Sequence, residues 1–327
     1  LSGKMFYTKT NEYSLKASNI NILSKSIRPL PTLKEKDGDL FNKFEDKELR
    51  YRHRYLDFIA NPDNKKIFIK RHKIIQAFRA FLDETDYIEV ETPVLQPLYG
   101  GANARPFTTH HHTLDEKLYM RIAVELYLKR LIVGGFPKVY ELSKNFRNEG
   151  MDKNHNPEFT MLEFYQSFSD VYDMMDLTEN MLRAVFKSLK TTNVSFNGKI
   201  INFNDQFLRV KMNDLMEDEF GVENIMLDDQ KIIDIAKKLE LDIDLPASIL
   251  LDKIFSLKIE PKLQNPTFVY DYPKSISPLS KIKRDQADSI VERFELFMGG
   301  MEIANAFTEL NDPLDQRDRF ISQEKLK

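Results

Sequence analysis

Apolar residues recur every three or four positions between residues 61 and 85, which predicts a long amphipathic helix. The apolar positions that share one helical face are Ile67, Ile74, Ile75, Phe78, Phe81 and Leu82. Asn61 is a good N-cap and Pro62 fits the first helical position, so we expect the helix to begin there. A second helix is predicted over residues 121–133, because Gly134-Gly135 follows it as a stop signal.

Alternation of apolar and polar residues predicts several strands in the middle of the chain. Residues 88–92 alternate in this way and end at Pro93, which favours an edge strand or a bulge. Two strand-like runs between residues 139 and 166 flank a polar loop at residues 150–157. Asn197-Gly198 lies between β-rich flanks and is the strongest local hairpin signal.

The last third of the chain combines helical and strand-like patterns. Residues 213–262 are mostly helical in pattern and resemble an insertion, and strand-like segments return at residues 267–270 and from Phe294 onward. Regular strand-helix-strand alternation is absent from the pattern. We therefore predict an α+β fold, in which an antiparallel β-sheet is flanked by helices.

The beginning of the chain has a different character. Residues 5–23 hold two short strand-like runs that are too short to bury a face alone, so we expect them to end a β-barrel begun upstream. Residues 24–50 include Pro29 and Asp37-Gly38-Asp39 with mixed charge, a composition typical of a linker. The predicted parts are residues 1–28, the barrel end; 29–60, the linker; and 61–327, the main domain.

Composition limits the classes of function. With 48 Lys and Arg residues against 51 Asp and Glu residues, the formal net charge of -3 means that an RNA partner would need a local basic patch. The sequence contains no cysteine, which excludes disulfides, thiolate metal sites and cysteine nucleophiles. We find no apolar run that predicts a membrane span and expect a cytoplasmic protein. Because Leu1 opens the chain without a start methionine, we interpret the sequence as a fragment.

Polar side chains occupy alternate positions in the first of the two runs that flank the polar loop. If the two runs pair as a hairpin, Arg147 and Glu149 share one face with Phe159, Glu163 and Tyr165. A guanidinium, carboxylates and an aromatic ring on a rigid sheet suit a ligand with a phosphate and a stacking base. On the pattern alone, the alternative is a solvated face with incidental ion pairs.

The residues around this loop resemble a known family. The twenty residues 146–165 resemble the second signature of class II aminoacyl-tRNA synthetases, in the form of the lysine, aspartate and asparagine subgroup. Residues 81–97 resemble the first signature, which implies a homodimer through this region. The early strands resemble the end of the family's OB-type anticodon-binding barrel. The third signature is expected beyond Phe320, so we expect this fragment alone to be inactive.

Three segments are most similar to the lysine branch of that subgroup: residues 98–115, 121–136 and 293–313. The lysine-pocket residues that this resemblance implies are Gly101, Ala102, Glu125, Tyr165, Asn305 and Glu309. The implied function is ATP-dependent activation of L-lysine to lysyl-adenylate, followed by transfer to tRNA(Lys). A buried ammonium needs carboxylate partners, so Glu125 and Glu309 are expected to contact the ε-ammonium of the substrate.

The same resemblance implies a nucleotide site. Its catalytic residues would be Arg147 and Glu149, and its ATP contacts would be Arg147, Glu149, His155, Asn156 and Phe159. Arg147 would hold the α-phosphate, where charge develops in the transition state, and Phe159 would stack on the adenine. Glu295 and Glu302 would bind the cofactor Mg²⁺ through carboxylate oxygens.

Some features depart from the family or point elsewhere. Asn154 stands where the family usually has an arginine, which puts the contacts of this loop in doubt. His110-His111-His112 resembles a metal cluster, but adjacent side chains of a strand do not converge on one ion. Two alternatives remain: a synthetase paralogue that lysylates a protein such as elongation factor P, and a non-catalytic binding module.

Overall fold

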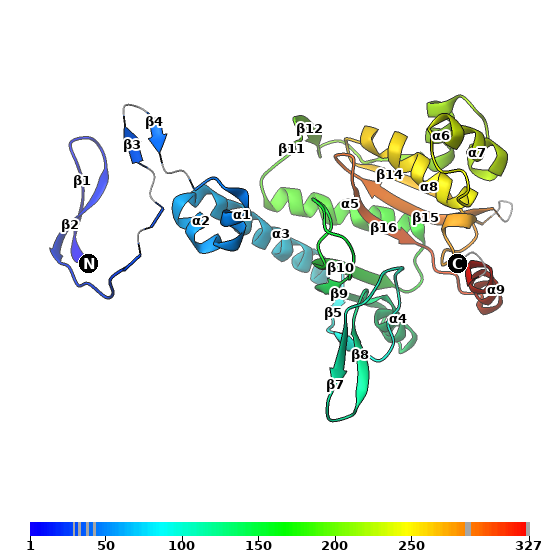
Figure 1. Ribbon diagram of the computed structural model, residues 1–327, viewed down its shortest axis with the longest axis horizontal. Helices are drawn as coiled ribbons and strands as arrows, with labels where there is room; N and C mark the ends of the chain where they lie inside the picture. Colours follow the sequence, from blue (N-terminus) through cyan, green and yellow to red (C-terminus); the bar gives the residue numbers. More distant parts are fainter. Residues whose placement is uncertain (29, 32–33, 37–38, 42–43, 285–288, 325–327) are drawn as a thin grey trace. The chain divides into compact units, whose positions relative to one another are not determined.

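The computed structural model describes residues 1–28, 30–31, 34–36, 39–41, 44–284 and 289–324 (Figure 1). It divides into two compact units, Leu1–His72 and Lys73–Lys327, and each is described by itself. Pro29 and Asp37-Gly38, which contributed to the linker prediction, lie outside the described residues. No helix in the described part of the chain is long and apolar enough to cross a membrane.

Two small antiparallel ribbons lie in the first unit. Strands β1 (Ser2–Tyr7) and β2 (Tyr13–Asn19) pair from Tyr7 opposite Tyr13, across a turn in which Asn11 has a φ of 63°. Strands β3 (Lys34–Lys36) and β4 (Asp39–Phe41) form the second ribbon. The strand pattern of residues 5–23 is therefore confirmed, while the assignment of these strands to an OB-type barrel stays a prediction.

Helices α1 (Lys47–Arg52) and α2 (Arg54–Ala60) occupy part of the segment whose composition predicted a linker. They are followed by the 3₁₀ turn η1 (Pro62–Asn64) and by α3 (Lys65–Glu84), which confirms the long helix. Asn61 makes no side-chain cap. Its amide instead donates to Asp57 Oδ1 at 3.0 Å, so the predicted capping role is wrong.

Asp57 explains why these short helices form. Its side chain is fully buried, and it accepts hydrogen bonds from Arg50, Arg54, Asn61 and Asn64 at 2.7 to 3.1 Å. Burial alone would raise the pKa of this carboxyl, but these bonds outweigh burial and lower the pKa to about 2. The composition of this segment suggested solvated charges. In the structure, Arg50 and Arg54 instead both bind the buried Asp57 carboxylate.

A three-stranded sheet in the second unit carries the predicted hairpin. Strands β9 (Lys138–Phe146) and β10 (Glu158–Gln166) are antiparallel, with Phe146 opposite Glu158 and Lys138 opposite Gln166. Strand β5 (Ile88–Glu89) pairs in parallel with β9. The strand predicted over residues 88–92 is thus shorter than expected, because the Thr92 backbone N–H donates to the Glu141 carboxylate instead of to a neighbouring strand.

A second sheet has the order β13-β14-β15-β16. Its strands are β13 (Leu208–Lys211), β14 (Thr267–Pro273), β15 (Ile290–Phe297) and β16 (Glu302–Phe307). Only β13 and β14 pair in parallel; the other two pairings are antiparallel. The strands predicted at residues 267–270 and from Phe294 onward are confirmed.

Helix α5 (Val171–Ser188) packs on this second sheet and begins with a capping box made by Asp170 and Asp173. Its buried residues Val171 and Met175 share a core cluster with Phe268 and Phe294 of the sheet. The helix thereby fixes the segment after β10 against β15 and β16, the two strands that carry the expected metal ligands.

The mostly helical segment at residues 213–262 is also confirmed. It comprises α6 (Met212–Phe220), η2 (Ile225–Leu227), α7 (Asp229–Lys238), α8 (Ala247–Lys258) and η3 (Glu260–Lys262). Its apolar residues share a core cluster with Val269, Tyr272, Val291 and Phe297 of the second sheet. With helices packed on largely antiparallel sheets, the predicted α+β class is confirmed.

Shorter elements complete the unit. They are β6 (Leu95–Gln96), β7 (Thr108–His111), β8 (Glu116–Met120), α4 (Glu125–Val133), β11 (Asn193–Phe196), β12 (Lys199–Asn202), η4 (Lys274–Ile276) and α9 (Pro313–Glu324). The hairpin at Asn197-Gly198 is confirmed, and both residues have the positive φ that its turn requires, 48° and 77°. The helix predicted over residues 121–133 exists but begins at Glu125.

We predict that Asp57→Asn lowers the melting temperature by several degrees at neutral pH, because the amide cannot form the ion pairs with Arg50 and Arg54. The carboxyl pKa is depressed from 3.8 to about 2, so its stabilisation is present above pH 3.8 and is lost as the pH falls toward 2. Thermal unfolding should show the difference between variant and wild type shrinking over that window. Asp63→Asn, at a side chain that is 85% exposed, is the control; equal melting of Asp57→Asn and wild type at neutral pH would contradict the prediction.

Candidate active site

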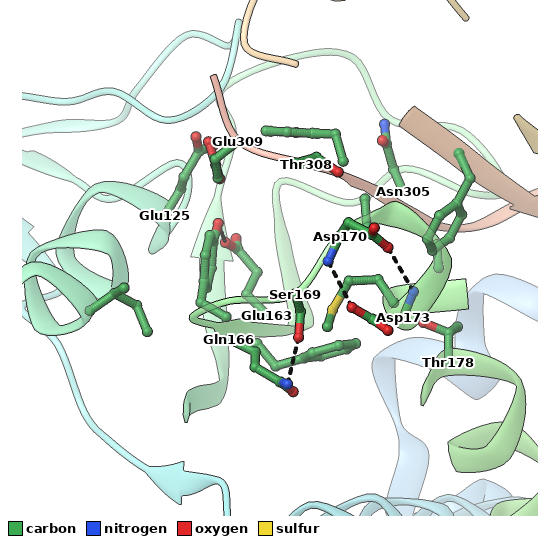
Figure 2. Close-up of a pocket in the computed structure, with 18 of the residues that line it drawn as sticks. Glu125, Glu163, Gln166, Ser169, Asp170, Asp173, Thr178, Asn305, Thr308 and Glu309 are labelled. Atoms are coloured by element: carbon green, nitrogen blue, oxygen red, sulfur yellow. Dashed lines mark hydrogen bonds between the residues drawn. The ribbon is translucent and has the colours of Figure 1, made fainter. Parts of the chain in front are cut away.

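A cavity of about 1190 Å³ in the second unit brings together most of the residues predicted for the substrate (Figure 2). The predicted site residues that line it are Gly101, Glu125, Arg147, Tyr165, Glu302, Asn305 and Glu309. The predicted residues that do not line it are Ala102, Glu149, His155, Asn156, Phe159 and Glu295. Most residues predicted to bind lysine therefore line one cavity. Most residues predicted to bind ATP and Mg²⁺ do not line it.

The register of β9 and β10 builds the floor of this cavity. Phe159 lies opposite Asn145 and Glu163 lies opposite Glu141, so these residues project to one face of the sheet, as the alternation predicted. The other face packs Tyr140 against Leu82 in a hydrophobic cluster. The polar face is also largely inside the protein, since Glu141 and Asn145 are buried, which argues against the alternative of a solvated face.

One end of the cavity holds a pair of carboxylates. Figure 2 shows Glu125, from the first turn of α4, and Glu309, from just after β16, pointing toward one another. Lys129 Nζ lies 2.5 Å from Glu125 Oε1 and 2.9 Å from Glu309 Oε2. The two carboxylates predicted for the substrate ammonium are therefore adjacent, and they already share one ammonium of the protein.

Glu163 is a third acid of the cavity. Its position on the polar face of the hairpin was predicted, but a role in the lysine pocket was not. It lines the cavity and accepts a hydrogen bond from the Tyr165 hydroxyl at 3.0 Å. Burial and the nearby charge of Glu125 raise the pKa of Glu163. Its two-residue spacing from Tyr165 is the signal that could have identified it.

Arg147 presents a cation to the same cavity. Its Cζ lies 5.1 Å from the centre of the Phe159 ring, a cation-π contact that orients the guanidinium. Its Nε is buried and has no hydrogen-bond acceptor among the described residues. Since a buried donor without an acceptor is costly, an anionic group of a ligand would stabilise this arrangement.

The loop between β9 and β10 keeps its polar residues away from the cavity. Asp152 accepts from the backbone N–H groups of Asn154 and His155, and its Oδ2 lies 2.8 Å from His155 Nδ1. These bonds lower the pKa of Asp152 to about 2. Glu149 accepts from the Arg105 backbone at 3.3 Å. The predicted ATP contacts of Glu149, His155 and Asn156 therefore stay predictions.

The two predicted metal ligands lie on neighbouring strands. Glu295 on β15 accepts from the Tyr272 hydroxyl at 2.8 Å and pairs with Arg293 at 2.5 Å, whereas Glu302 on β16 lines the cavity. Burial and the negative charge of Glu295 raise the pKa of Glu302 to about 7. Two acids in mutual repulsion suit a divalent cation that keeps water and phosphate as its other ligands. No preassembled group of three or more acidic or histidine ligands occurs among the described residues.

Some other residues that line the cavity were not predicted from the sequence. Ser169 and Asp170 come from the segment before α5, and Lys281 and Arg284 from the segment before β15. Arg284 pairs with the buried Glu292 at 3.1 Å, and its other nitrogen reaches Asp170. The contact of Arg284 with Asp170 joins segments more than a hundred residues apart, so no local pattern could have identified it.

The repulsion between Glu302 and Glu295 yields a prediction about stability. The folded-state pKa of Glu302 is raised from 4.5 to about 7, so its ionisation costs folding stability as the pH rises through that window. Glu302→Gln should therefore melt above the wild type at pH values over 7, in metal-free buffer, and close to it near pH 4.5. Differential scanning calorimetry measures this, with Glu116→Gln on β8 as the control, and a constant difference at every pH would overturn the assignment.

Residues 46–327 match the family described as tRNA synthetases class II (D, K and N). The chain is 49% identical to a lysine–tRNA ligase of Azobacteroides pseudotrichonymphae, over 100% of this chain and 66% of the relative. It is 48% identical to those of Porphyromonas gingivalis (strain W83; 100% of this chain, 57% of the relative) and Clostridium novyi (99% and 64%). The chain thus spans less than two thirds of the length of these relatives.

Proposed function

The chain belongs to the class II tRNA synthetases of the D, K and N group, and we propose that it is the catalytic part of a lysine–tRNA ligase. The relatives described above carry that name. The observation that carries the proposal is the carboxylate pair Glu125 and Glu309, which closes one end of the cavity and already binds an ammonium. In this proposal the ε-ammonium of L-lysine is held by that pair.

The other acids and the aromatic residue of the floor complete the proposed lysine site. Glu163 lines the cavity, where it is available to the α-ammonium, and it accepts hydrogen bonds from the Tyr165 hydroxyl and the Val124 backbone. Asn305 also lines the cavity and accepts from Arg293 at 3.2 Å. Gly101 has a φ of 86°, and a Cβ there would approach Glu125 Cβ to 3.1 Å, so a side chain at this position would crowd the carboxylate.

Arg147 is the proposed electrostatic catalyst. As the lysine carboxylate attacks the α-phosphate of ATP, negative charge develops on the phosphoryl oxygens and pyrophosphate leaves. A guanidinium already fixed over Phe159 stabilises that charge without reorganising. Glu295 and Glu302 would hold Mg²⁺, which supplies further positive charge to the phosphates when bound. Glu149, His155, Asn156 and Phe159 are the proposed further ATP contacts.

The proposal includes a transfer step and an assembly. The lysyl group would pass to tRNA(Lys), and two copies would associate through residues 81–97. Ile88, Val94 and Leu95 in that segment are 39 to 49% exposed, which supports an apolar contact between copies. The proposed compartment is the cytoplasm, where this reaction and its tRNA would be found.

The two alternatives find less support. A paralogue that modifies a protein would lack the anticodon-binding barrel, whereas this chain begins with β1 and β2, which are predicted to end such a barrel. A non-catalytic module would not need Arg147 and Glu302, yet both line the same cavity. We therefore keep lysine activation as the proposal.

Glu309→Gln tests the lysine site. In the full-length natural protein, it should lower kcat/KM for lysine in ATP-pyrophosphate exchange by about 10 to 10², because the Glu309 side chain is 38% exposed and its loss costs less than the roughly 3 to 5 kcal/mol of unpairing a fully buried charge. The control is Glu84→Gln on α3, an exposed carboxylate outside the cavity. Unchanged lysine-dependent exchange in the Glu309 variant would refute the assignment of the ammonium site.

Arg147→Lys tests the nucleotide side. Lysine keeps the charge but cannot form a planar two-point contact with phosphate oxygens, so kcat for pyrophosphate exchange should fall about 10² to 10³. Lys144→Gln is the matched control, since this exposed side chain on β9 points to the opposite face and pairs with Glu158. Wild-type kcat in Arg147→Lys, with folding intact, would exclude a catalytic role for this residue.

A further inference from the structure

We propose that Lys129 is a positioning residue, which bridges Glu125 and Glu309 so that their remaining oxygens form a site for a single ligand ammonium. This inference rests on the proposed function, because it explains how the proposed lysine site is kept ready before the substrate arrives. It concerns a residue that neither the sequence analysis nor the lining of the cavity points to.

The geometry of the bridge divides the carboxylate oxygens into two sets. Lys129 contacts Glu125 Oε1 and Glu309 Oε2, at 2.5 and 2.9 Å. Glu125 and Glu309 line the cavity, whereas Lys129 does not. The Lys129 ammonium therefore contacts the two carboxylates from the side of the protein and not from the side of the cavity. Glu125 Oε2 faces Gly101, where a Cβ would lie 3.7 Å from it. One oxygen of each carboxylate is thus left without a protein partner among the described residues.

Local structure holds Lys129 in this place. Glu125 and Lys129 are four residues apart on α4, with the acid nearer the N-terminus, which is the favourable order for such a pair. The Lys129 Nζ also lies 5.6 Å from the centre of the Phe307 ring on β16. The bridge therefore ties the helix to the strand that precedes Glu309, and among the described residues no other basic side chain pairs with either carboxylate.

Charge compensation is the proposed purpose of the bridge. Two carboxylates close together repel one another, and without a cation one of them takes up a proton. Burial raises the pKa of Glu309, and Lys129 opposes that rise. Burial works against the charge of Lys129, but Glu309 and Glu125 outweigh it and raise the pKa of the ammonium. The bridged pair keeps a net charge of about one negative unit, which matches a single ammonium.

Other titratable groups face the same place and must be considered in any pH experiment. They are Glu163 and Tyr165 on β10, whose pKa values are both raised, first by burial. Neither forms an ion pair with Lys129 among the described residues. Both groups are present in wild type and Lys129 variants, so a difference in slope between the two proteins reports on the Glu125 and Glu309 pair together with Glu163, on which the charge of Glu125 acts.

The test is lysine binding by isothermal titration calorimetry, with the full-length natural protein and its Lys129→Met variant, in the absence of ATP. A ligand ammonium binds the ionised pair, so in the variant a proton must leave first. We expect the Kd for lysine to fall by up to tenfold per pH unit as the pH rises through neutrality, with release of up to about one proton per lysine bound. The wild type should show a nearly flat profile. Titrations in two buffers with different ionisation enthalpies count the protons directly.

Further variants separate charge from folding. Lys129→Arg keeps the charge and should restore the flat profile, whereas Lys129→Gln should release protons as Lys129→Met does, which keeps the test usable if the methionine variant does not fold. Arg130→Met is the matched control, since Arg130 lies on the same helix and pairs with no carboxylate in the part of the chain that the structure describes. A neutral variant with the wild-type slope and proton count would overturn the proposal for Lys129. In contrast, a wild type that does not bind lysine, or binds it independently of Glu309, would overturn the proposed function itself.

Discussion

The antiparallel register of β9 and β10 is the constraint on which the cavity depends. With Glu163 opposite Glu141, one face of the pair carries the ligand-facing side chains, while Tyr140 and Phe164 fill the core on the other. A slip of one residue would turn Glu163 and Tyr165 into that core and expose its aromatic rings. The buried ion pair of Arg121 with Glu141, at 2.6 Å, further fixes β9, because the same guanidinium also donates to the Lys144 carbonyl.

Acidic side chains that are buried, and those that line the cavity, differ in their surroundings in the second unit. Those away from the cavity are fully compensated: Glu141 pairs with Arg121, Glu292 with Arg284 and Asp271 with Lys283. Three acids that line the cavity, Glu163, Glu302 and Glu309, are partly exposed or exposed, and their pKa values are raised. Unfavourable ionisation is therefore concentrated where cationic groups of ligands would relieve it, which is a signature of a binding site rather than of a structural core.

Much of this arrangement could be predicted from the sequence because it follows from local periodicity. The alternation in β9 and β10 and the Asn197-Gly198 turn need only neighbouring residues to be interpreted. Contacts across long separations could not be predicted in this way: Lys129 reaches Glu309, and Arg284 reaches Asp170, only because the sheets bring them together. For the same reason, the charged residues around Asp57 were predicted to belong to a linker. Their shared partner, the buried Asp57 carboxylate, can be identified only in the folded chain. The roles of individual site residues follow from the resemblance to a family and not from any local pattern.

The cavity presents both groups that bind cations and a group that binds anions. This combination determines which reaction the cavity could support. At one end carboxylates favour ammonium groups, and elsewhere on the same wall Arg147, with an unsatisfied buried donor, favours an anion. An amino acid with a cationic side chain and an anionic phosphate ester satisfy both demands only when bound together. Nothing in this arrangement requires a covalent intermediate on the protein, because charge on the substrates is met by fixed countercharge. In the proposed reaction, rate enhancement would then come from holding the carboxylate of the amino acid beside a phosphate whose developing charge is already matched.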